Sequence, residues 1–222
     1  MTQGHVIAAT GLVREARILA GPGIVAVAGG GDRGRLEAEI EAACEGAAGI
    51  ISIGLGGALA EGLAPGDWVV GSRVGAVETN PAWTNRLLSK LPGARLGPVA
   101  GSDVMVVDAA AKAALHAVSG ALVVDMESHI AARVAARHGL PFAVARTISD
   151  GADRALPRAA QAGMRPDGGM DVVAVIASLA QRPWELPALV RTGIEAEAAF
   201  GALLRGRQLL GSALMGPGAD LG

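Results

Sequence analysis

The chain alternates short apolar runs with segments in which apolar residues recur at helical spacing. Strands are expected at 5–9, 24–28, 49–53, 67–71, 121–124 and 142–148. Helices are expected at 14–19, 81–91, 109–118 and 171–179, between the last two strands, and within 185–210. A further helix is expected to begin at 32, with Leu36, Ile40, Ala43 and Ala47 at helical spacing. Such alternation predicts one α/β domain over residues 1–222, with three layers (α/β/α) around a mixed, mainly parallel twisted sheet.

Two of the expected helices are amphipathic and should bury one face. The inward residues are expected to be Ala110, Ala114, Leu115 and Val118 in the first helix, and Ile130, Val134 and Ala135 in the second. A Pro-rich segment at 182–187 then separates a C-terminal helical tail, about 182–222, from the body. This segment is interpreted either as a connector or as a cover over a pocket or a subunit contact. The Gly-rich end after Gly211 is expected to fray.

Composition and charge narrow the class of protein. With 222 residues, 51% of them hydrophobic, and a net charge of −2, the chain can bury a substantial core and has no basic surface for nucleic acid. Aromatic residues for base stacking are scarce, with two Phe, three Trp and no Tyr. The N-terminus lacks the pattern of a signal peptide, and the longest apolar run, 172–180, is too short to cross a bilayer. A cytoplasmic protein with a small-molecule substrate and no transmembrane segment is expected.

Cysteine and histidine give no sign of a disulfide or a metal centre. Cys44 is the single cysteine and lies in a helical pattern, which is typical of a small buried residue. The four histidines, His5, His116, His129 and His138, do not show the spacing of metal ligands. We therefore expect no metal ion.

Three Gly-rich turns follow apolar runs, at 29–31, 54–57 and 101–102. Glycine lets a backbone approach a ligand closely and point N–H groups at it. Residues 29–34 formally match the Gly-x-Gly-x-x-Gly pattern of dinucleotide sites. The acid expected about 20 residues later is missing, however, and there is no Walker lysine. A nicotinamide cofactor is therefore not expected.

The first of these turns is instead a candidate anion site. Gly30 and Gly31 offer backbone N–H groups, and Arg33 follows closely. Arg35 and Arg73 could add positive charge, although all three arginines could equally be solvated surface residues. Phosphate therefore stays open as a co-substrate, and no other cofactor is expected.

Carboxylates gather where the expected strands end. Glu15 follows the first strand, Asp125 and Glu127 follow the strand of 121–124, and Asp150 and Asp153 follow that of 142–148. Each acid alone could simply cap or begin a helix. Because ligands of open α/β sheets bind at the carboxyl ends of strands, the acids together predict a site on one rim of the sheet.

Five short motifs occur in a fixed order along the chain. They are GLGG at 54–57, PGDWVV at 65–70, VDMES at 124–128, LPF at 140–142 and RTISDGAD at 146–153. In this order, and over roughly residues 5–180, they resemble the nucleoside phosphorylase/nucleosidase superfamily. Within it, the motifs are most similar to those of the methylthioadenosine/S-adenosylhomocysteine nucleosidases.

The resemblance implies roles for particular residues. Glu127 matches the glutamate that binds the ribose hydroxyls, and Met126 matches the methionine that packs against the sugar. Asp150 matches the aspartate that bonds N7 and the 6-amino group of adenine, and Glu15 matches the glutamate that activates water. The expected substrate-binding set is completed by Ser149, Gly57, Met105 and Phe142.

The chemistry of N-glycosidic cleavage is consistent with such a set. Positive charge develops on the ribosyl ring and negative charge on the departing base. A carboxylic acid near N7 can protonate the base, an ionised carboxylate favours the cationic sugar, and a third carboxylate can activate the nucleophile. Hydrolysis and phosphorolysis are both open, with Glu15 near the nucleophile favouring water over phosphate.

The sequence also departs from the nucleosidases. Residues 101–106 contain no aromatic residue where those enzymes stack adenine on Phe, so Val104 or Met105 would supply the apolar face. The tail at 182–222 and the turn at 29–32 resemble phosphorylase-like proteins associated with hopanoid biosynthesis. That resemblance implies release of adenine from adenosylhopane, and weak membrane association if the substrate is a lipid.

Other functions stay open beside this one. They are a methylthioadenosine/S-adenosylhomocysteine nucleosidase, a phosphate-dependent purine nucleoside phosphorylase and, from a different class, a non-catalytic nucleoside-binding protein. In each case the resemblance implies a homodimer.

Overall fold

The computed structural model describes residues 4–162 and 171–218, apart from the side chain of Val172. The strands are β1 (His5–Thr10), β2 (Ile24–Ala28), β3 (Ala47–Ala58), β4 (Trp68–Val74), β5 (Val77–Glu78), β6 (Arg95–Gly101), β7 (Val123–Asp125) and β8 (Phe142–Asp150). The α-helices are α1 (Val13–Leu19), α2 (Arg33–Ala42), α3 (Pro81–Lys90), α4 (Ala109–Ser119), α5 (Ser128–His138), α6 (Arg158–Ala162), α7 (Val172–Gln181) and α8 (Leu186–Leu210). Two short 3-10 helices, η1 (Pro183–Glu185) and η2 (Ser212–Met215), flank α8.

The eight strands form one mixed sheet, in the order β2-β1-β3-β7-β6-β4-β5, with β8 paired to both β3 and β4. Five strand pairs are parallel and three are antiparallel. The sheet is therefore mixed and mainly parallel, which confirms the prediction from the sequence. Because β8 joins β3 to β4, the strands β3, β8, β4, β6 and β7 pair in a closed ring.

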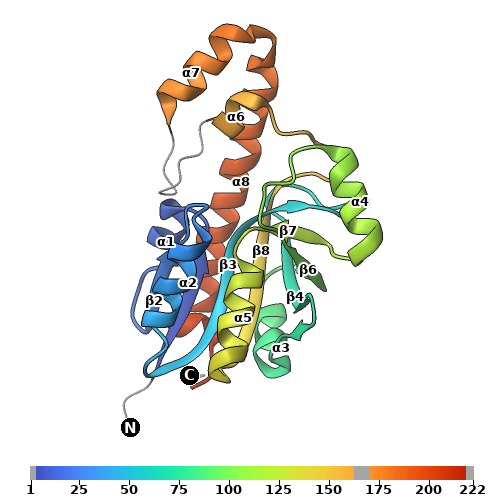
Figure 1. Cartoon of the computed structure of the whole chain (residues 1–222). Coiled ribbons are helices and arrows are strands. Elements are labelled where there is room, and N and C mark those ends of the chain that lie inside the picture. Colours follow the sequence, from blue (N-terminus) through green and yellow to red (C-terminus); the bar gives the residue numbers. More distant parts are fainter. Residues whose placement is uncertain (1–3, 163–170, 219–222) are drawn as a thin grey trace.

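Helices cover both faces of the sheet, which confirms the predicted three layers (Figure 1). Successive residues of a strand point to opposite faces. Ile7 of β1 packs in the core under α2 and α5, whereas the next residue, Ala8, packs under α1, α3 and α8. In α5 the predicted inward residues Ile130 and Val134 are buried in the first of these cores.

β3 is longer than predicted, which corrects the loop expected at 54–57. These residues continue the strand to Ala58 and pair with β8 and β7. A Cβ atom at Gly56 would lie 2.6 Å from Val123 Cγ2, so glycine allows β7 to come close. The preceding helix is correspondingly shorter, because α2 ends at Ala42 and Ala47 already begins β3.

The predicted orientation of α4 was wrong for three of its four residues, whereas Leu115 is half-buried and packs against Ala121 and Val124. Val118, which was expected to face inward, is 84% exposed, and Ala110 and Ala114 are also exposed. Lys112 is the buried residue of this helix, with an exposed fraction of 0%. The helix therefore turns Lys112 and Leu115 toward the protein and leaves the rest of its apolar stripe exposed.

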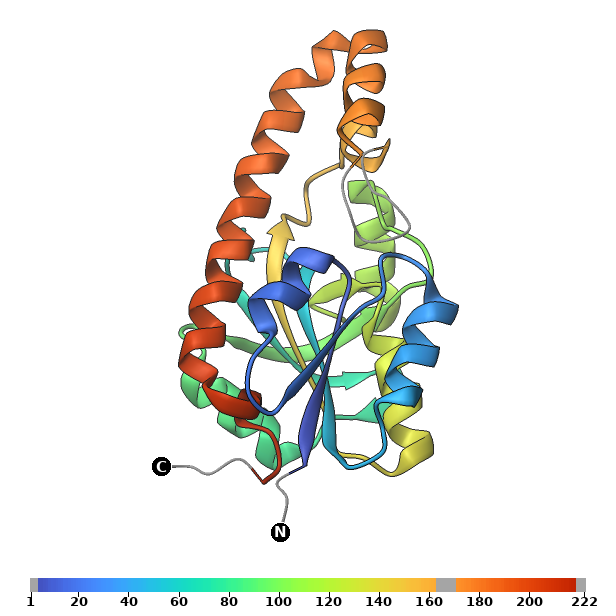
Figure 2. The same cartoon turned by 90° about the vertical axis from the view of Figure 1, so that its left-hand side faces the viewer.

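Residues 212–216 pack against the body, which corrects the fraying expected directly after Gly211, whereas the part of that prediction at 219–222 lies outside the described residues. Leu214 is fully buried, and its carbonyl accepts a 3.0 Å hydrogen bond from Trp83 Nε1. At the other end of α8, this helix forms with α6 and α7 a projection beyond the sheet, on the side to which the β8 arrow points (Figure 2). Within the described residues, none of the helices combines the length and apolar character needed to span a bilayer.

Candidate active site

Predicted carboxylates are buried together around the second half of β3; they are Glu15, Asp125, Glu127 and Asp150. The N–H of Leu55 donates to Glu15 Oε1 at 2.6 Å. Two residues further along β3, Gly57 lies opposite Asp150 of β8 and next to β7. The closed ring of strands thus brings together acids that are more than 100 residues apart in the sequence.

Arg146 of β8 supplies the positive charge at the centre of this group. Its side chain is fully buried, with Nε 2.9 Å from Asp125 Oδ2 and Nη1 3.5 Å from Glu127 Oε2. Nη2 donates to Ser52 Oγ, and Nη1 donates to the Leu55 carbonyl at 3.3 Å. A buried guanidinium requires such partners, and here it offsets several carboxylates at once.

Asp125 and Glu127 have different roles at the start of α5. Asp125 Oδ1 accepts hydrogen bonds from the N–H groups of Glu127 (2.9 Å) and Ser128 (2.7 Å) and so caps the helix. The Glu127 side chain makes no cap and lies against Gly11, where a Cβ atom would be 2.8 Å from Oε1. Burial raises the pKa of Glu127 to about 8; Arg146 opposes this shift, and nearby carboxylates add to it.

Glu15 lies on the other side of Gly11. Its Oε2 atom accepts hydrogen bonds from the N–H groups of Gly11 (2.8 Å) and Leu12 (2.6 Å), which is the arrangement of a first-turn helix acid. The bond from Leu55 to Oε1 goes further and joins α1 to β3. Burial raises the pKa of Glu15, while Arg146 and the three N–H donors oppose the shift.

Asp150 is the last residue of β8 and does not cap a helix. Its Oδ1 atom accepts a 2.6 Å hydrogen bond from Ser149 Oγ, and its Oδ2 atom accepts one from Lys112 Nζ. A Cβ atom at Gly57 would lie 3.3 Å from Oδ2, so the Asp150 carboxylate packs closely against the Gly57 backbone. The structure thus places Ser149 and Gly57, two of the predicted substrate-binding residues, beside Asp150.

The first Gly-rich turn faces Glu127. Gly30 and Gly31 have positive φ angles of 63° and 85°. A shallow depression is lined by Gly29, Gly31, Asp32, Arg33, Leu36, Met126, Glu127 and Ile130. Arg33 Nη1 is 2.5 Å from Asp103 Oδ2, and Arg35 donates to the carbonyl of Ala28 at 2.8 Å. Both candidate phosphate-binding arginines therefore have partners within the protein.

Two predicted residues, Phe142 and Arg73, do not join the carboxylates. Phe142 begins β8 and is buried in the core opposite Ile50, whereas Asp150 ends the same strand, about 26 Å away at about 3.3 Å per residue. Arg73 lies on β4 and donates to the Gly75 carbonyl at 2.9 Å. Met105 is half-buried in the loop between β6 and α4.

Sequence reasoning missed the two buried cations of the site. Arg146 stands in one of the quoted motifs, yet nothing in its neighbours indicates that it balances Asp125 and Glu127. Lys112 lies in a segment with an apolar helical stripe, where a lysine is typical of the solvent-exposed face. The signal that could have found both is charge balance, since buried carboxylates require cations nearby.

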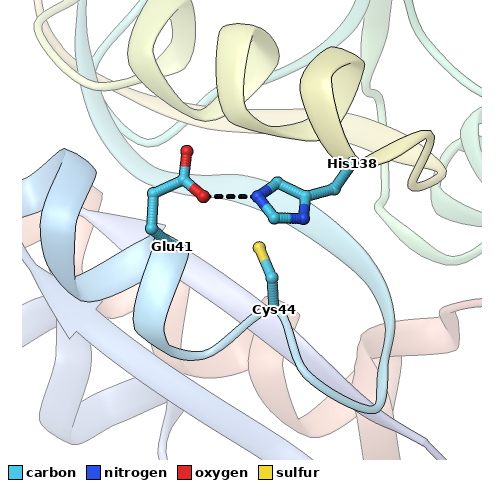
Figure 3. A group of neighbouring side chains, drawn as sticks. All are labelled: Glu41, Cys44 and His138. Carbon is cyan, nitrogen blue, oxygen red and sulfur yellow. Dashed lines mark hydrogen bonds and ion pairs between the residues drawn. The ribbon is translucent and has the colours of Figure 1, made fainter.

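One cluster has the residue types of a metal site. Glu41, Cys44 and His138 have ligand atoms within 4.8 Å of one another. Figure 3 shows the thiol and the carboxylate pointing toward the imidazole. However, Glu41 already pairs with His138 and Arg137, and Cys44 Sγ donates to the Ile40 carbonyl at 3.3 Å. The carboxylate of this cluster is therefore already paired, and the guanidinium of Arg137 beside it disfavours a metal ion there.

The comparison with protein families shows where the chain belongs. Residues 10–182 match the family model of the phosphorylase superfamily. The chain is a member of this superfamily. The matched range contains Glu15, Glu127 and Asp150, and it ends where the C-terminal helical tail begins. A comparison with curated proteins gives no match.

Solved structures of nucleosidases share the fold of this superfamily member. The 5′-methylthioadenosine/S-adenosylhomocysteine nucleosidase of Helicobacter pylori superposes with a TM-score of 0.65 at 15% identity, covering 95% of this chain and 97% of that one. The corresponding enzyme of S. pneumoniae, solved with a transition-state inhibitor, gives 0.59 at 18% identity and covers 93% and 100%. The futalosine hydrolase of H. pylori gives 0.60 at 16% identity and covers 92% and 97%.

Proposed function

We propose that this protein cleaves the N-glycosidic bond of an adenine nucleoside. The proposal rests on the buried group of Glu15, Glu127 and Asp150 around the Arg146 cation. The likeness of the fold to nucleosidases and to a futalosine hydrolase supports it. Arg146 and Asp150 are four residues apart on β8, about 13 Å in an extended strand, which suits a sugar at one end and a base at the other.

Glu127 is proposed to bind the ribose hydroxyls, with Met126 packed against the sugar. A neutral Glu127 can donate one hydrogen bond and accept others, whereas an ionised one only accepts. Because cleavage makes the ribosyl ring positive, the transition state favours the ionised form beneath it. The Arg146 guanidinium, 3.5 Å from Glu127, limits how far burial suppresses that form.

Glu15 is proposed to accept a proton from the attacking water. Burial raises the pKa of Glu15, so its carboxylate holds a proton taken from water more readily than an exposed one would. In the free protein both carboxylate oxygens accept backbone N–H groups, so water would bind to the remaining lone pairs. Asp150 is proposed to face N7 and the 6-amino group of adenine.

Water is proposed as the nucleophile, with no cofactor. A phosphate site requires free cationic donors. Arg33 pairs with Asp103, Arg35 binds the Ala28 carbonyl, and Glu15 would repel a phosphate. Phosphorolysis through Gly30 and Gly31 is the alternative, and the products distinguish the two reactions, because hydrolysis gives ribose and phosphorolysis gives ribose 1-phosphate.

A large apolar 5′ group is proposed for the substrate, as in adenosylhopane. The projection of α6, α7 and α8 carries exposed apolar side chains on the side to which β8 points, namely Val173, Ile176, Trp184, Leu186, Val190 and Ile194. Exposed apolar area of this kind typically marks a binding surface. Methylthioadenosine or S-adenosylhomocysteine is the alternative, supported by the nucleosidase folds.

A homodimer is proposed as the assembly. An open groove on another face of the protein is lined in part by Val99, Leu115, Val118 and Ala132. Val118 is 84% exposed there, which is costly for a monomer in water. Light scattering on Val118→Asp and on the unmodified protein tests this assembly, since a dimer formed through the groove should dissociate in the variant.

The experiment that tests the function is adenine release from several 5′-modified adenosines, with and without phosphate. We expect release without phosphate, and loss of at least about a hundredfold in turnover in Asp150→Asn with the fold retained. Near-normal turnover by that variant would refute the role of Asp150. Binding of all substrates without release from any would instead indicate a nucleoside-binding protein.

A further inference from the structure

We propose that Lys112 is a positioning residue that acts through Asp150: it supplies to Asp150 the proton that the leaving adenine receives. The inference rests on the proposed function, because it assigns the source of a proton to the same site. Lys112 lies on α4, outside the motifs that indicate the site, and no role for it follows from them.

The first support is the way in which the ammonium is buried. The Lys112 side chain is 0% exposed, whereas that of Asp150 is 8% exposed, so only the carboxylate of the pair is accessible to a ligand. An isolated buried ammonium is strongly unfavourable. Here its three N–H groups meet three acceptors, which are Asp150 Oδ2, the Gly151 carbonyl (2.9 Å) and the Arg154 carbonyl (3.0 Å).

The second support is the placement of Lys112 in its helix. It is the one buried residue of α4, whereas Val118 and Ala114 are exposed in the single chain. A structural link between α4 and the 151–154 turn needs only the two carbonyl contacts. The third contact, to Asp150, directs a transferable N–H proton of the ammonium at Oδ2, which is the Asp150 oxygen closest to Gly57.

The chemistry follows from the charge states of the pair. An ionised Asp150 beside an ammonium has no proton to give. As the C1′–N9 bond breaks and its electron pair moves onto the base, one Nζ–H bond of Lys112 breaks and an Oδ2–H bond forms. That O–H bond then breaks as N7–H forms, and neutral adenine leaves. The water proton taken by Glu15 passes through solvent to Asp150, the accessible member of the pair, and from Oδ2 back to Lys112, so the cycle consumes only water.

The test compares two leaving groups. Adenosine requires a proton on the base, whereas 4-nitrophenyl riboside releases a stable anion that needs none. For Lys112→Met we expect kcat/KM for adenosine to fall at least about a hundredfold, with less than threefold change for the nitrophenyl riboside. Lys112→Arg keeps the charge but cannot release a proton, so it should show the same selective loss. Lys90→Met, which changes the chain's other lysine, an exposed residue of α3, is the matched control.

The outcomes separate this inference from the proposed function. Equal loss on both substrates for Lys112→Met would mean a purely structural role and would overturn the inference, as would full adenosine activity in Lys112→Arg. Thermal unfolding identifies a variant that fails to fold, and Lys112→Gln, which retains an N–H donor, then serves for the same comparison. Asp150→Asn is measured in parallel. If Asp150→Asn loses no adenosine activity, the role of Asp150 and this inference fail together, whereas the proposed function itself fails only if the unmodified protein releases adenine from no adenosine derivative.

Discussion

The Nε atom of Arg146 lies 2.9 Å from Asp125 Oδ2, and neither side chain is more than 1% exposed. The two atoms are at ion-pair distance, although their angle does not make a hydrogen bond. Asp125 uses its other oxygen to cap α5. The pair therefore ties β8 to the helix start that presents Glu127, so the geometry of the site and the stability of the fold depend on the same charges.

The first prediction concerns this cation. Arg146→Met should lower the free energy of unfolding by about 3–5 kcal/mol, because it leaves buried carboxylates without a compensating charge. Urea unfolding at pH 7 measures the change. Arg133→Met is the matched control, since Arg133 pairs with Glu37 at 2.8 Å but is 50% exposed, and it should cost about 1 kcal/mol or less. Equal losses in the two variants would contradict the central role of Arg146.

Hydrophobic periodicity predicted the layers of the fold, because each strand and most helices bury one regular face. It misplaced most of the apolar stripe of α4, since Lys112 is buried through hydrogen bonds to Asp150, Gly151 and Arg154 that only the folded chain brings together. The glycines at 54–57 suggested a loop, yet they serve the close approach of β7. Local sequence signals therefore predict elements well, whereas contacts between distant buried charges are not visible in them.

In the candidate site, too, the sequence predicted local positions but not which distant residues meet. The positions of Glu15, Glu127 and Asp150 near strand ends were predicted, and the structure describes them as buried around β3. Phe142 shared a motif with these acids, but it begins the strand that Asp150 ends. A motif gives the order of residues along the chain, and the direction of the strand decides which of them reach the site.

The second prediction uses the pKa of Glu127, which burial raises to about 8 from an ordinary value of 4.5. The folded chain then binds this proton more tightly than the unfolded chain, so stability falls as the pH rises between these two values, and the loss is complete above pH 8. Glu127→Gln avoids the ionised form. The melting temperature of the variant minus that of the unmodified protein should therefore be larger at pH 8.5 than at pH 5. Each kcal/mol of stability that the unmodified protein loses corresponds to roughly 2–4 °C of this difference. A difference that does not change with pH would contradict this reasoning.

The third prediction separates the two interpretations of Glu15. Glu15→Gln keeps an oxygen that can accept the N–H groups at the start of α1, but it cannot take a proton from water. We expect kcat for adenine release to fall by about 10²–10⁴, with adenine binding little changed. The melting temperature should fall modestly, because the Gln amide has only one oxygen and cannot also accept the Leu55 N–H. A variant that is active but unstable would show that Glu15 acts only as a helix acid.

The fourth prediction tests the apolar 5′ group of the proposed substrate. Val173 and Ile176 are 76% and 62% exposed on α7, and a bound alkyl chain would cover them. Changing both to Asn should lower kcat/KM for a long 5′-alkyl adenosine by roughly tenfold or more, since each buried CH₂ contributes about 0.8 kcal/mol. Adenosine itself does not reach the projection and should react at the normal rate. Leu96→Asn changes a residue of β6 that is 52% exposed, and it should affect neither substrate. If the Val173 and Ile176 changes reduce both reactions equally, α7 supports the fold of the site and does not select the 5′ group.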